Sequence, residues 1–269
     1  MKSRVKIFLS KHRRSRLIQK LDQSFIGFHR AYENMNYDFS SNGEENVLKR
    51  LKATISCKTI FDVGANNGEW SCLTSTIFPD AHIHAFEIMP ETFQSLLNAT
   101  SQIENFSPHN VGLSDVEGTI PVYYSPDKSS LATCVPEFSE KFHRYKPKKL
   151  VTNITKGDIF CRNKSIDTVD FLKIDVEGHE HNVLKGFEGM LKAGRVKIIQ
   201  FEYGYVNICT HFLLKDYYEY LEGFDMKIGK IYPRYVDFRE YSYSDENFFG
   251  PNYLAVHSSC GEVIDSLSA

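Results

Sequence analysis

Long apolar runs, paired cysteines and a marked net charge are all missing from this chain of 269 residues. No apolar run approaches the ~20 residues that cross a bilayer, and Ile7-Phe8-Leu9 is too short for the core of a signal peptide, so we expect neither a membrane span nor secretion. The six cysteines are scattered without a Cys-x-x-Cys pair, which argues against a zinc knuckle or a redox motif and favours reduced thiols in a cytoplasm. The net charge of −2 gives the whole molecule no nucleic-acid signal.

Positive charge is nevertheless concentrated at the start of the chain. The first 20 residues contain no acid and eight cations, namely Lys2, Arg4, Lys6, Lys11, Arg13, Arg14, Arg16 and Lys20. We interpret them as a solvated, frayed basic helix, with a patch for anionic lipid or an acidic partner as the alternative. No repeat or clear linker divides the chain, and its length suits one large α/β domain with additions. We therefore predict a basic helical extension over residues 1–40 and a main domain over residues 41–269.

Apolar runs and amphipathic stretches alternate through the main domain. This order predicts βαβ units and a largely parallel sheet with helices on both faces. The expected strands cover residues 59–63, 81–87, 109–113, 169–174, 196–201, 226–231 and 253–257, the last two as an antiparallel pair. The expected helices cover residues 69–77, 91–99, 180–191 and 213–221, and capping-box spacing from Ser41 to Glu44 predicts one more before the first strand.

Residues 125–150 break this rhythm. They hold Pro126, Pro136 and Pro147 and few periodic apolar positions, between short extended pieces expected at 119–124 and 150–154. A loop of this length inside a compact domain is usually functional or disordered. We predict a lid or an acceptor-binding loop.

The segment from Ile60 to Glu69 joins an apolar strand to a helix through the glycine turn Asp62-Val63-Gly64-Ala65-Asn66-Asn67-Gly68. Glycine lets the backbone approach a ligand where a Cβ would collide, and the helix N-terminus offers free N–H groups. The Asp-x-Gly-x-Asn-x-Gly spacing differs from the Gly-x-Gly-x-x-Gly of a dinucleotide site and lacks the Lys-Ser/Thr of phosphate-binding loops. A plain tight turn is the alternative.

Acidic or glycine residues follow five predicted strands, at the edge where an open α/β sheet binds its ligands. They are Asp62-Val63-Gly64, Glu87, Ser114-Asp115, Asp175-Val176-Glu177-Gly178-His179 and Glu202. Glu87 stands about 20 residues past the glycine turn, where an acid accepts the ribose hydroxyls of an adenosine cofactor; a solvated acid or a helix cap is the alternative. With the turn, it indicates S-adenosylmethionine or a nucleotide. Asp62 is expected near the cofactor's amino-acid end, unless it only fixes the turn.

The second dense motif runs from Phe171 to Glu180. Lys173, Asp175 and Glu177 have strand spacing and can share one face, where charged side chains cost desolvation unless they are paired or bind a ligand. Pairing of Lys173 with one of the two acids, tying strand to helix, is the structural alternative. We favour a functional role.

These motifs resemble the FkbM-type family of S-adenosylmethionine-dependent methyltransferases. The resemblance covers roughly residues 42–257 and rests on residues 61–68, Ala85-Phe86-Glu87-Ile88-Met89-Pro90, Asn110 to Asp115 with Gly118, Ser129-Ser130-Leu131, and Asp170 to Glu180 with Val183-Leu184-Lys185-Gly186. It departs from the family pattern at Ile88, where proline is common, and at His179, where a small residue is common.

The resemblance implies a class I methyltransferase fold over the main domain, with a Rossmann-like, seven-stranded, mostly parallel sheet in the order 3-2-1-4-5-7-6. It also implies O-methylation of a hydroxyl on a sugar or a secondary metabolite. The expected cofactor-binding residues are Asp62, Gly64, Asn66, Asn67, Gly68, Glu87, Ser114, Asp115 and Asp175.

Methyl transfer from a sulfonium to a hydroxyl needs alignment of the acceptor oxygen and removal of its proton. We expect the catalytic residues among Asp175, Glu177, His179 and Glu202. Asp175 and Glu202, with Glu177 or His179, could hold one Mg²⁺ ion that lowers the pKa of the acceptor hydroxyl. Direct general-base catalysis by His179 or a carboxylate is the alternative.

Three other functions compete with methyl transfer to a small hydroxyl compound. A nicotinamide oxidoreductase would need the missing third glycine, and a non-catalytic nucleotide-binding protein would not need acids at every strand end. A nucleic-acid methyltransferase would need a basic face or an Asn/Asp-Pro-Pro-Tyr/Phe motif, where Asp175-Val176-Glu177-Gly178 stands instead.

The acceptor is expected to be a sugar or glycan hydroxyl, mainly from the resemblance. Aromatic residues crowd the C-terminal third and suit sugar stacking, an ordinary core or a dimer interface: Tyr203, Tyr205, Phe212, Tyr232, Tyr235, Phe238, Tyr241, Tyr243, Phe248 and Phe249. We predict a cytoplasmic protein without a nucleic-acid partner. A homo-oligomer and a peripheral membrane or glycan-assembly contact through the basic N-terminus remain open.

Overall fold

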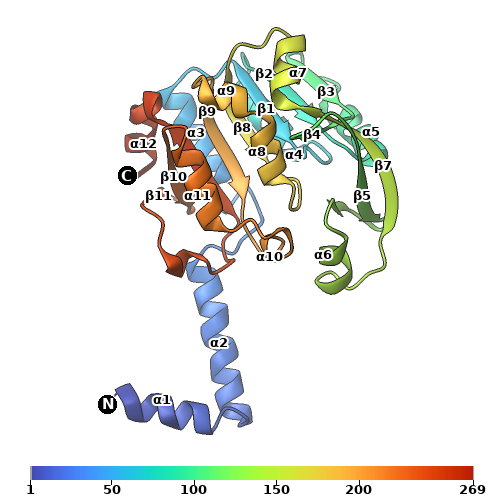
Figure 1. Cartoon of the computed structure of the whole chain (residues 1–269). Helices are drawn as coiled ribbons and strands as arrows, with labels where there is room; N and C mark the ends of the chain where they lie inside the picture. The colour runs from blue at the N-terminus through green and yellow to red at the C-terminus, as the bar shows by residue number, and fades with distance from the viewer. Residues whose placement is uncertain (1, 269) are drawn as a thin grey trace.

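The computed structural model describes residues 2–268 and shows a central mixed sheet flanked by helices (Figure 1). Eight strands are arranged in the order β11-β10-β12-β9-β8-β1-β2-β3. They are β1 (Thr59–Val63), β2 (His82–Phe86), β3 (Phe106–His109), β8 (Val169–Ile174), β9 (Val196–Glu202), β10 (Met226–Ile231), β11 (Val236–Phe238) and β12 (Asn252–His257). Parallel pairing joins β3, β2, β1, β8 and β9, whereas β12 lies antiparallel between β9 and β10.

This topology confirms the predicted α/β class I methyltransferase fold, but the predicted count of seven strands was wrong. Seven of the strands keep the order 3-2-1-4-5-7-6, and β11 pairs beyond β10 as an eighth strand at the sheet edge. With three residues, β11 is too short to produce an apolar pattern that a sequence can reveal.

Two hydrophobic clusters lie on opposite faces of the sheet, because successive strand side chains point to opposite sides. Phe61 and Val63 of β1 face one cluster, which includes side chains of α7 (Gly157–Asn163), α8 (Glu180–Gly186), α9 (Glu188–Lys192) and α11 (Leu214–Glu222). Ile60 faces the other, formed with α3 (Glu44–Thr54), α4 (Glu69–Ile77) and α12 (Gly261–Ser268). Helix α5 (Pro90–Thr100) contacts α4 and β3. Further short helical elements are α10 (Asn207–Thr210) and the 3-10 turns at Tyr243–Asp245 and Ser258–Cys260.

A second, four-stranded sheet in the order β4-β7-β5-β6 stands beside the first (Figure 1). Its strands are β4 (Gly112–Ser114), β5 (Gly118–Ser125), β6 (Lys128–Thr133) and β7 (Lys148–Lys156), with α6 (Pro136–Lys141) between β6 and β7. The expected loop at 125–150 is therefore largely ordered structure. The extended pieces expected at 119–124 and 150–154 are confirmed as parts of β5 and β7.

Three local predictions were wrong. The strand expected at 109–113 is two strands in different sheets, since the chain turns after His109 and Asn110 Nδ2 donates to the Glu87 carbonyl at 2.8 Å. The helix expected at 180–191 breaks at Phe187, beside Gly186, whose Cβ position lies 2.1 Å from the Ser114 carbonyl oxygen. The Ser41–Glu44 capping box does not form.

At the start of α3, where the N-cap residue is Gly43, other hydrogen bonds form instead of that box. Ser41 Oγ donates to the Asp38 carboxylate at 2.8 Å, whereas the Glu44 backbone N–H donates to Asn42 Oδ1 at 3.0 Å. The Glu44 carboxylate is buried and accepts from the side-chain amides of Asn42 and Asn252. A buried carboxylate with such partners is not free to reach back to the N-cap backbone.

The N-terminal segment forms two helices, α1 (Lys2–Lys11) and α2 (Arg16–Tyr32), that extend away from the sheets (Figure 1). No residue of α2 is buried, but Glu33 and Asn34 directly after it are. Between residues 2 and 268, no helix has the length and apolar character needed to cross a membrane. The six cysteines are free thiols. The domain boundary at residue 40 stays a prediction.

Candidate active site

A cavity of about 730 Å³ lies between the carboxyl ends of β1, β2, β8 and β9 on one side and the second sheet with α6 on the other. The parallel strands bring the residues that follow them to one edge, as expected for this topology. Seven of the predicted site residues line it: Gly64, Asn66, Glu87, Asp175, Glu177, His179 and Glu202. Asp62, Asn67, Gly68, Ser114 and Asp115 lie outside this lining.

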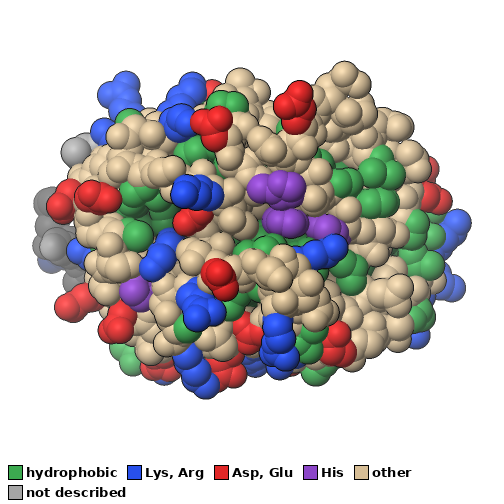
Figure 2. All heavy atoms as spheres, turned by 90° about the horizontal axis from the view of Figure 1, so that it is seen from above, with side chains coloured by type: hydrophobic (Ala, Val, Ile, Leu, Met, Phe, Trp, Pro, Cys, Tyr) green, Lys and Arg blue, Asp and Glu red, His purple; other side chains and the backbone are tan. Residues whose placement is uncertain are grey.

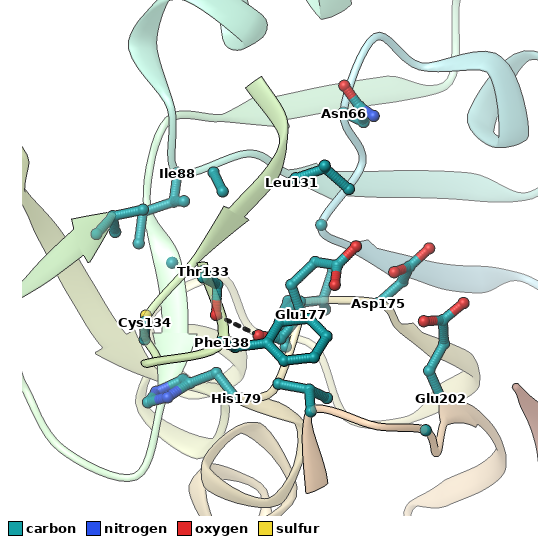
Figure 3. A pocket seen from close by; sticks show the side chains of 18 of the residues that line it. Asn66, Ile88, Leu131, Thr133, Cys134, Phe138, Asp175, Glu177, His179 and Glu202 are labelled. Atoms are coloured by element: carbon teal, nitrogen blue, oxygen red, sulfur yellow. Dashed lines mark hydrogen bonds between the residues drawn. The ribbon is translucent and has the colours of Figure 1, made fainter. Parts of the chain in front are cut away.

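Three carboxylates from the ends of β8 and β9 occupy the same side of the cavity, those of Asp175, Glu177 and Glu202 (Figure 3). Burial, followed by the neighbouring Asp175, raises the pKa of Glu177 to about 8. The same two causes, in the same order, hold the pKa of Glu202 well above its ordinary value. The cluster therefore favours protons or a cationic group near these oxygens.

The loop that carries Glu177 is held in an unusual conformation. Glu177 has φ +53° and Gly178 has φ +102°, so two successive residues lie in the left-handed region. Glu180 Oε1 accepts the backbone N–H groups of Val176 and Gly178 at 3.1 Å each, and the Thr133 hydroxyl of β6 donates to the Glu177 carbonyl (Figure 3). Glu180 thus serves as the support of this loop, a role that sequence reasoning missed although the residue stands inside the motif.

Lys173 is buried between two of the predicted acids. Its ammonium lies 2.9 Å from Asp175 Oδ2 and 3.7 Å from Asp62 Oδ1, and 5.6 Å from the centre of the Trp70 ring. Of the two predicted structural pairings, that of Lys173 with Asp175 therefore exists. Because Asp175 also lines the cavity, pairing and a functional role are compatible at this residue.

Asp62 is fully buried, away from the cavity lining. Its Oδ2 accepts the Ser71 hydroxyl of α4 at 2.7 Å, which ties the end of β1 to that helix. Burial raises the pKa of Asp62, while the Lys173 charge opposes that shift. A direct contact of Asp62 with the cofactor stays a prediction.

The glycines of the first turn are required by the chain itself. Gly64 has φ +84°, and a Cβ there would lie 1.8 Å from the Asp175 carbonyl oxygen. Gly68 has φ +87°, caps α4, and a Cβ there would lie 2.8 Å from Leu96 Cδ1. Close approach of β8 and α5 therefore explains both residues, in addition to the ligand approach that the sequence suggested.

Glu87 has the predicted helix-capping role, whereas its contact with a ribose stays a prediction. It lines the cavity, and its oxygens accept the backbone N–H groups of Asn66 at 2.9 Å and Met89, the N-cap residue of α5, at 2.7 Å. Burial raises its pKa to about 7. Each carboxylate oxygen keeps a further lone pair that a ribose hydroxyl can use.

His179 is separated from the three carboxylates. Its Nε2 lies 2.9 Å from Ser114 Oγ, which in turn donates to Asp115 Oδ1 at 3.1 Å, and its ring points away from the carboxylates (Figure 3). Burial, and then the neighbouring His181, lower its pKa to about 4. Ser114 and Asp115 thus orient a cavity-lining histidine and do not line the cavity themselves.

A model of the family described as Methyltransferase FkbM domain matches residues 62–226, more than half of the chain. The chain belongs to this family. The matched segment contains the glycine turn, Glu87, the Asp175–Glu180 loop and Glu202. It also contains the whole second sheet, so most of the cavity lining of this FkbM-family chain lies within the matched region, whereas Met35, Tyr37 and Pro251 lie outside it.

Two curated relatives and a solved structure illustrate what the chain is similar to. It is 29% identical over 165 residues to hexuronic acid methyltransferase AglP of Haloferax volcanii, covering 60% of this chain and 64% of that protein. It is 29% identical over 155 residues to methyltransferase sdnD of Sordaria araneosa, covering 48% and 60%. The chain thus spans less than two thirds of the length of these relatives. A crystal structure of methyltransferase FkbM from Methylobacillus flagellatus KT is 16% identical with a TM-score of 0.47, covering 74% of this chain and 43% of that one.

Metal binding is not evident from the side-chain positions in this FkbM-family chain. Among residues 2–268, no group of three or more His, Cys, Asp and Glu is placed to hold a metal ion. Binding of Mg²⁺ by Asp175 and Glu202 stays a prediction. It is based on the hard carboxylate oxygens of the two residues, which line the same cavity.

Several cavity residues were not predicted as site residues. Ile120, Val122, Leu131, Phe138, Phe142 and Ile154 form an apolar wall from the second sheet and α6, and Met35 and Tyr37 reach the cavity from the N-terminal segment. The sequence did indicate part of this wall, because residues 125–150 follow the third predicted strand and were predicted to form a lid or an acceptor-binding loop. Nothing in the local sequence marks Met35 or Tyr37. Of the C-terminal aromatics, Tyr203 and Tyr205 line the cavity, whereas Phe212 and Tyr241 pack against the core.

Proposed function

We propose that this chain transfers a methyl group from S-adenosylmethionine to a hydroxyl oxygen, and that the acceptor is a sugar in a glycan or glycoconjugate. The observation that supports this most is the union, in one cavity of an FkbM-family chain, of the Gly64 turn, Glu87 and the three carboxylates. The sugar acceptor is inferred from the name of the hexuronic acid methyltransferase relative. For the location we propose the cytoplasm, where free thiols stay reduced.

The residues of the cavity fit S-adenosylmethionine. Gly64 and Asn66 bring backbone to the lining beside Glu87, whose spare lone pairs suit the two ribose hydroxyls. Asp175 and Glu202 offer negative charge for the ammonium and the sulfonium. When bound, the cofactor would supply an activated methyl group.

The chain's own task would be to orient the acceptor and remove its proton. As the oxygen–methyl bond forms and the sulfur–methyl bond breaks, the hydroxyl proton must pass to a base. A carboxylate with a pKa near working pH is suited to that task, which favours Glu177, with a pKa of about 8, over His179, whose ring is turned towards Ser114. Glu202 and Asp175 remain candidates for the same role or for Mg²⁺.

A second candidate acceptor is a small secondary metabolite. The apolar wall around Leu131, Phe138 and Ile154 favours an acceptor with an apolar portion, which a bare sugar lacks. The same cavity would then serve O-methylation of a hydroxyl on a small, partly apolar metabolite.

A labelled methyl-transfer screen tests the proposal. Nucleotide sugars, free glycans, lipid-linked glycans and apolar phenols are incubated with the chain and S-adenosylmethionine, with and without Mg²⁺. We expect transfer to at least one hydroxyl class and loss of about 100-fold or more in Asp175→Ala. Titration calorimetry should detect S-adenosylmethionine binding and no binding of NAD.

Each part of the proposal can fail separately. Cofactor binding without transfer to any acceptor would indicate a non-catalytic binding protein. Full activity after EDTA treatment would rule out the metal, and unchanged turnover in a folded Asp175→Ala variant would overturn the site.

A further inference from the structure

Helix α2 presents an apolar stripe that nothing in the described chain covers. Its members Leu17, Leu21, Phe25, Phe28 and Tyr32 are between 45% and 71% exposed. Their spacing of three and four residues puts them on one side of the helix. The helix stands away from both sheets with no buried residue (Figure 1). A lone helix of this length is marginal in water, so the stripe indicates a binding surface.

The same segment holds a concentration of positive charge. Eight of the chain's 32 lysines and arginines lie in its first 20 residues, whereas all 34 acidic residues lie later. Helix α1 adds exposed Val5, Phe8 and Leu9, which share one face by their spacing. By contrast, the face of the molecule turned away from α2 shows basic and acidic side chains interspersed (Figure 2).

We propose that α1 and α2 form a binding site for the surface of an anionic lipid bilayer. Helices that lie in a membrane interface combine Phe- and Leu-rich faces with lysine and arginine, and basic clusters are attracted to anionic headgroups. Together, α1 and α2 offer exposed apolar side chains and a large excess of cations, with Asp22 as the one acidic residue within the two helices.

A second copy of the chain is the competing occupant of the stripe. Ile18, Leu21, Phe25, Phe28 and Tyr32 also follow the 3–4 spacing of a helix pair. The flanking positions, however, hold Asp22, Ser24, His29 and Ala31, which offer no set of complementary charges. Parallel pairing would also bring two basic α1 segments together, a repulsion that an anionic surface would remove.

The C-terminal end of α2 is fixed to the main domain. Lys230 Nζ lies 2.6 Å from Glu33 Oε2, and Asn34 Nδ2 donates to the carbonyls of Asn42 at 2.7 Å and Ile231 at 3.0 Å. A Cβ on Gly250 would lie 2.0 Å from the Glu33 carbonyl oxygen, so this junction is closely packed. Membrane binding by α2 would therefore orient the whole domain.

The junction leads directly into the cavity. Met35 and Tyr37, two and four residues past Glu33, line it, and Tyr37 is 64% exposed at its edge. A domain held through α2 would thus keep this edge of the cavity at a set distance from the lipid surface. If the chain acts as proposed above, its acceptor would itself be attached to lipid. This consequence rests on the proposed function, whereas lipid binding by α1 and α2 does not.

Vesicle co-sedimentation of the full chain tests the proposal. The probes are vesicles of phosphatidylcholine alone and of a roughly 3:1 mixture with phosphatidylglycerol. We expect binding to the mixed vesicles only, weakened by salt. Arg13→Glu with Arg14→Glu, and separately Phe25→Ser with Phe28→Ser, should each reduce the partition coefficient about tenfold or more.

A matched control removes exposed apolar side chains elsewhere. Val116→Ser with Val151→Ser, at 53% and 59% exposure on the main domain, should leave the partition coefficient unchanged. Equal binding to both vesicle types, or binding to neither, would overturn the proposal. So would a stable dimer by light scattering that Phe25→Ser with Phe28→Ser converts to monomer without changing vesicle binding. None of these measurements depends on methyl transfer, so a failed activity screen leaves this test intact.

Discussion

Glycine at position 64 is required by its own backbone conformation and by the neighbouring backbone of Asp175. Its φ of +84° and the 1.8 Å between its Cβ position and the Asp175 carbonyl oxygen leave no space for a side chain. We expect Gly64→Ala to lower the free energy of unfolding by about 3 kcal/mol or more, since β1 and β8 must separate.

Chemical denaturation of Gly64→Ala measures this loss. Gly261→Ala is the control, because that glycine has open space around it and no positive φ, and it should change stability by less than about 0.5 kcal/mol. Equal effects of the two substitutions would contradict the steric explanation.

Lys173 is the cation that makes a pair of acids tolerable inside the fold. Its side chain is 8% exposed and lies between Asp62, which is fully buried, and Asp175, which is 35% exposed at the cavity. We expect Lys173→Met to cost about 3 kcal/mol of stability, because it leaves buried carboxylate charge without a partner.

The control for Lys173→Met is a surface ion pair. Lys49→Met removes the partner of Glu45 on α3, where the lysine side chain is 62% exposed, and should cost no more than about 0.5 kcal/mol. Thermal unfolding of both variants distinguishes a buried from an exposed pair; similar losses would show that Lys173 is not acting through its charge.

At the scale of elements, β6 joins the loop after β8 through one hydroxyl. Thr133 of β6 donates to the carbonyl of Glu177, whose φ is positive. We expect Thr133→Val to lower stability by about 1 kcal/mol and to reduce kcat more than KM, because the carboxylate would lose its fixed position. Thr133→Ser keeps the hydroxyl and should restore turnover. A Ser variant as impaired as the Val variant would point to the methyl group instead.

At the scale of the whole molecule, the buried carboxyl groups set the pH dependence of stability. The pKa values of Glu87, Glu177 and Glu180 are raised by burial to about 7, 8 and 7. The folded state therefore binds these protons more tightly than the unfolded state. The resulting stability is complete below about pH 4.5 and is lost as pH rises through 7 to 8.

Urea unfolding between about pH 5 and 8 tests this expectation. The free energy of unfolding should fall with rising pH. In Glu177→Gln this decrease should be smaller by about 1 kcal/mol, since one of the titrating groups is gone. A Glu177→Gln curve parallel to that of the parent chain would show that Glu177 ionises normally in the folded state.

The sequence by itself determined the central sheet and the place of the candidate site. The limits of β1, β8 and α4 agree with prediction, because apolar runs between turn residues define them. Since parallel strands end at one edge, the acids following β2, β8 and β9 could be expected in one cavity, and Glu87, Asp175, Glu177 and Glu202 line it.

Only the tertiary structure decided how that edge is completed. It turns His179 towards Ser114, closes the cavity with the second sheet and α6, and brings in Tyr37 from outside the predicted domain. These features depend on contacts between distant residues, such as Thr133 with Glu177 and Asn34 with Ile231, 44 and 197 positions apart. Local periodicity reports which face of an element is apolar, but the side chain that meets that face is set by how the whole chain packs.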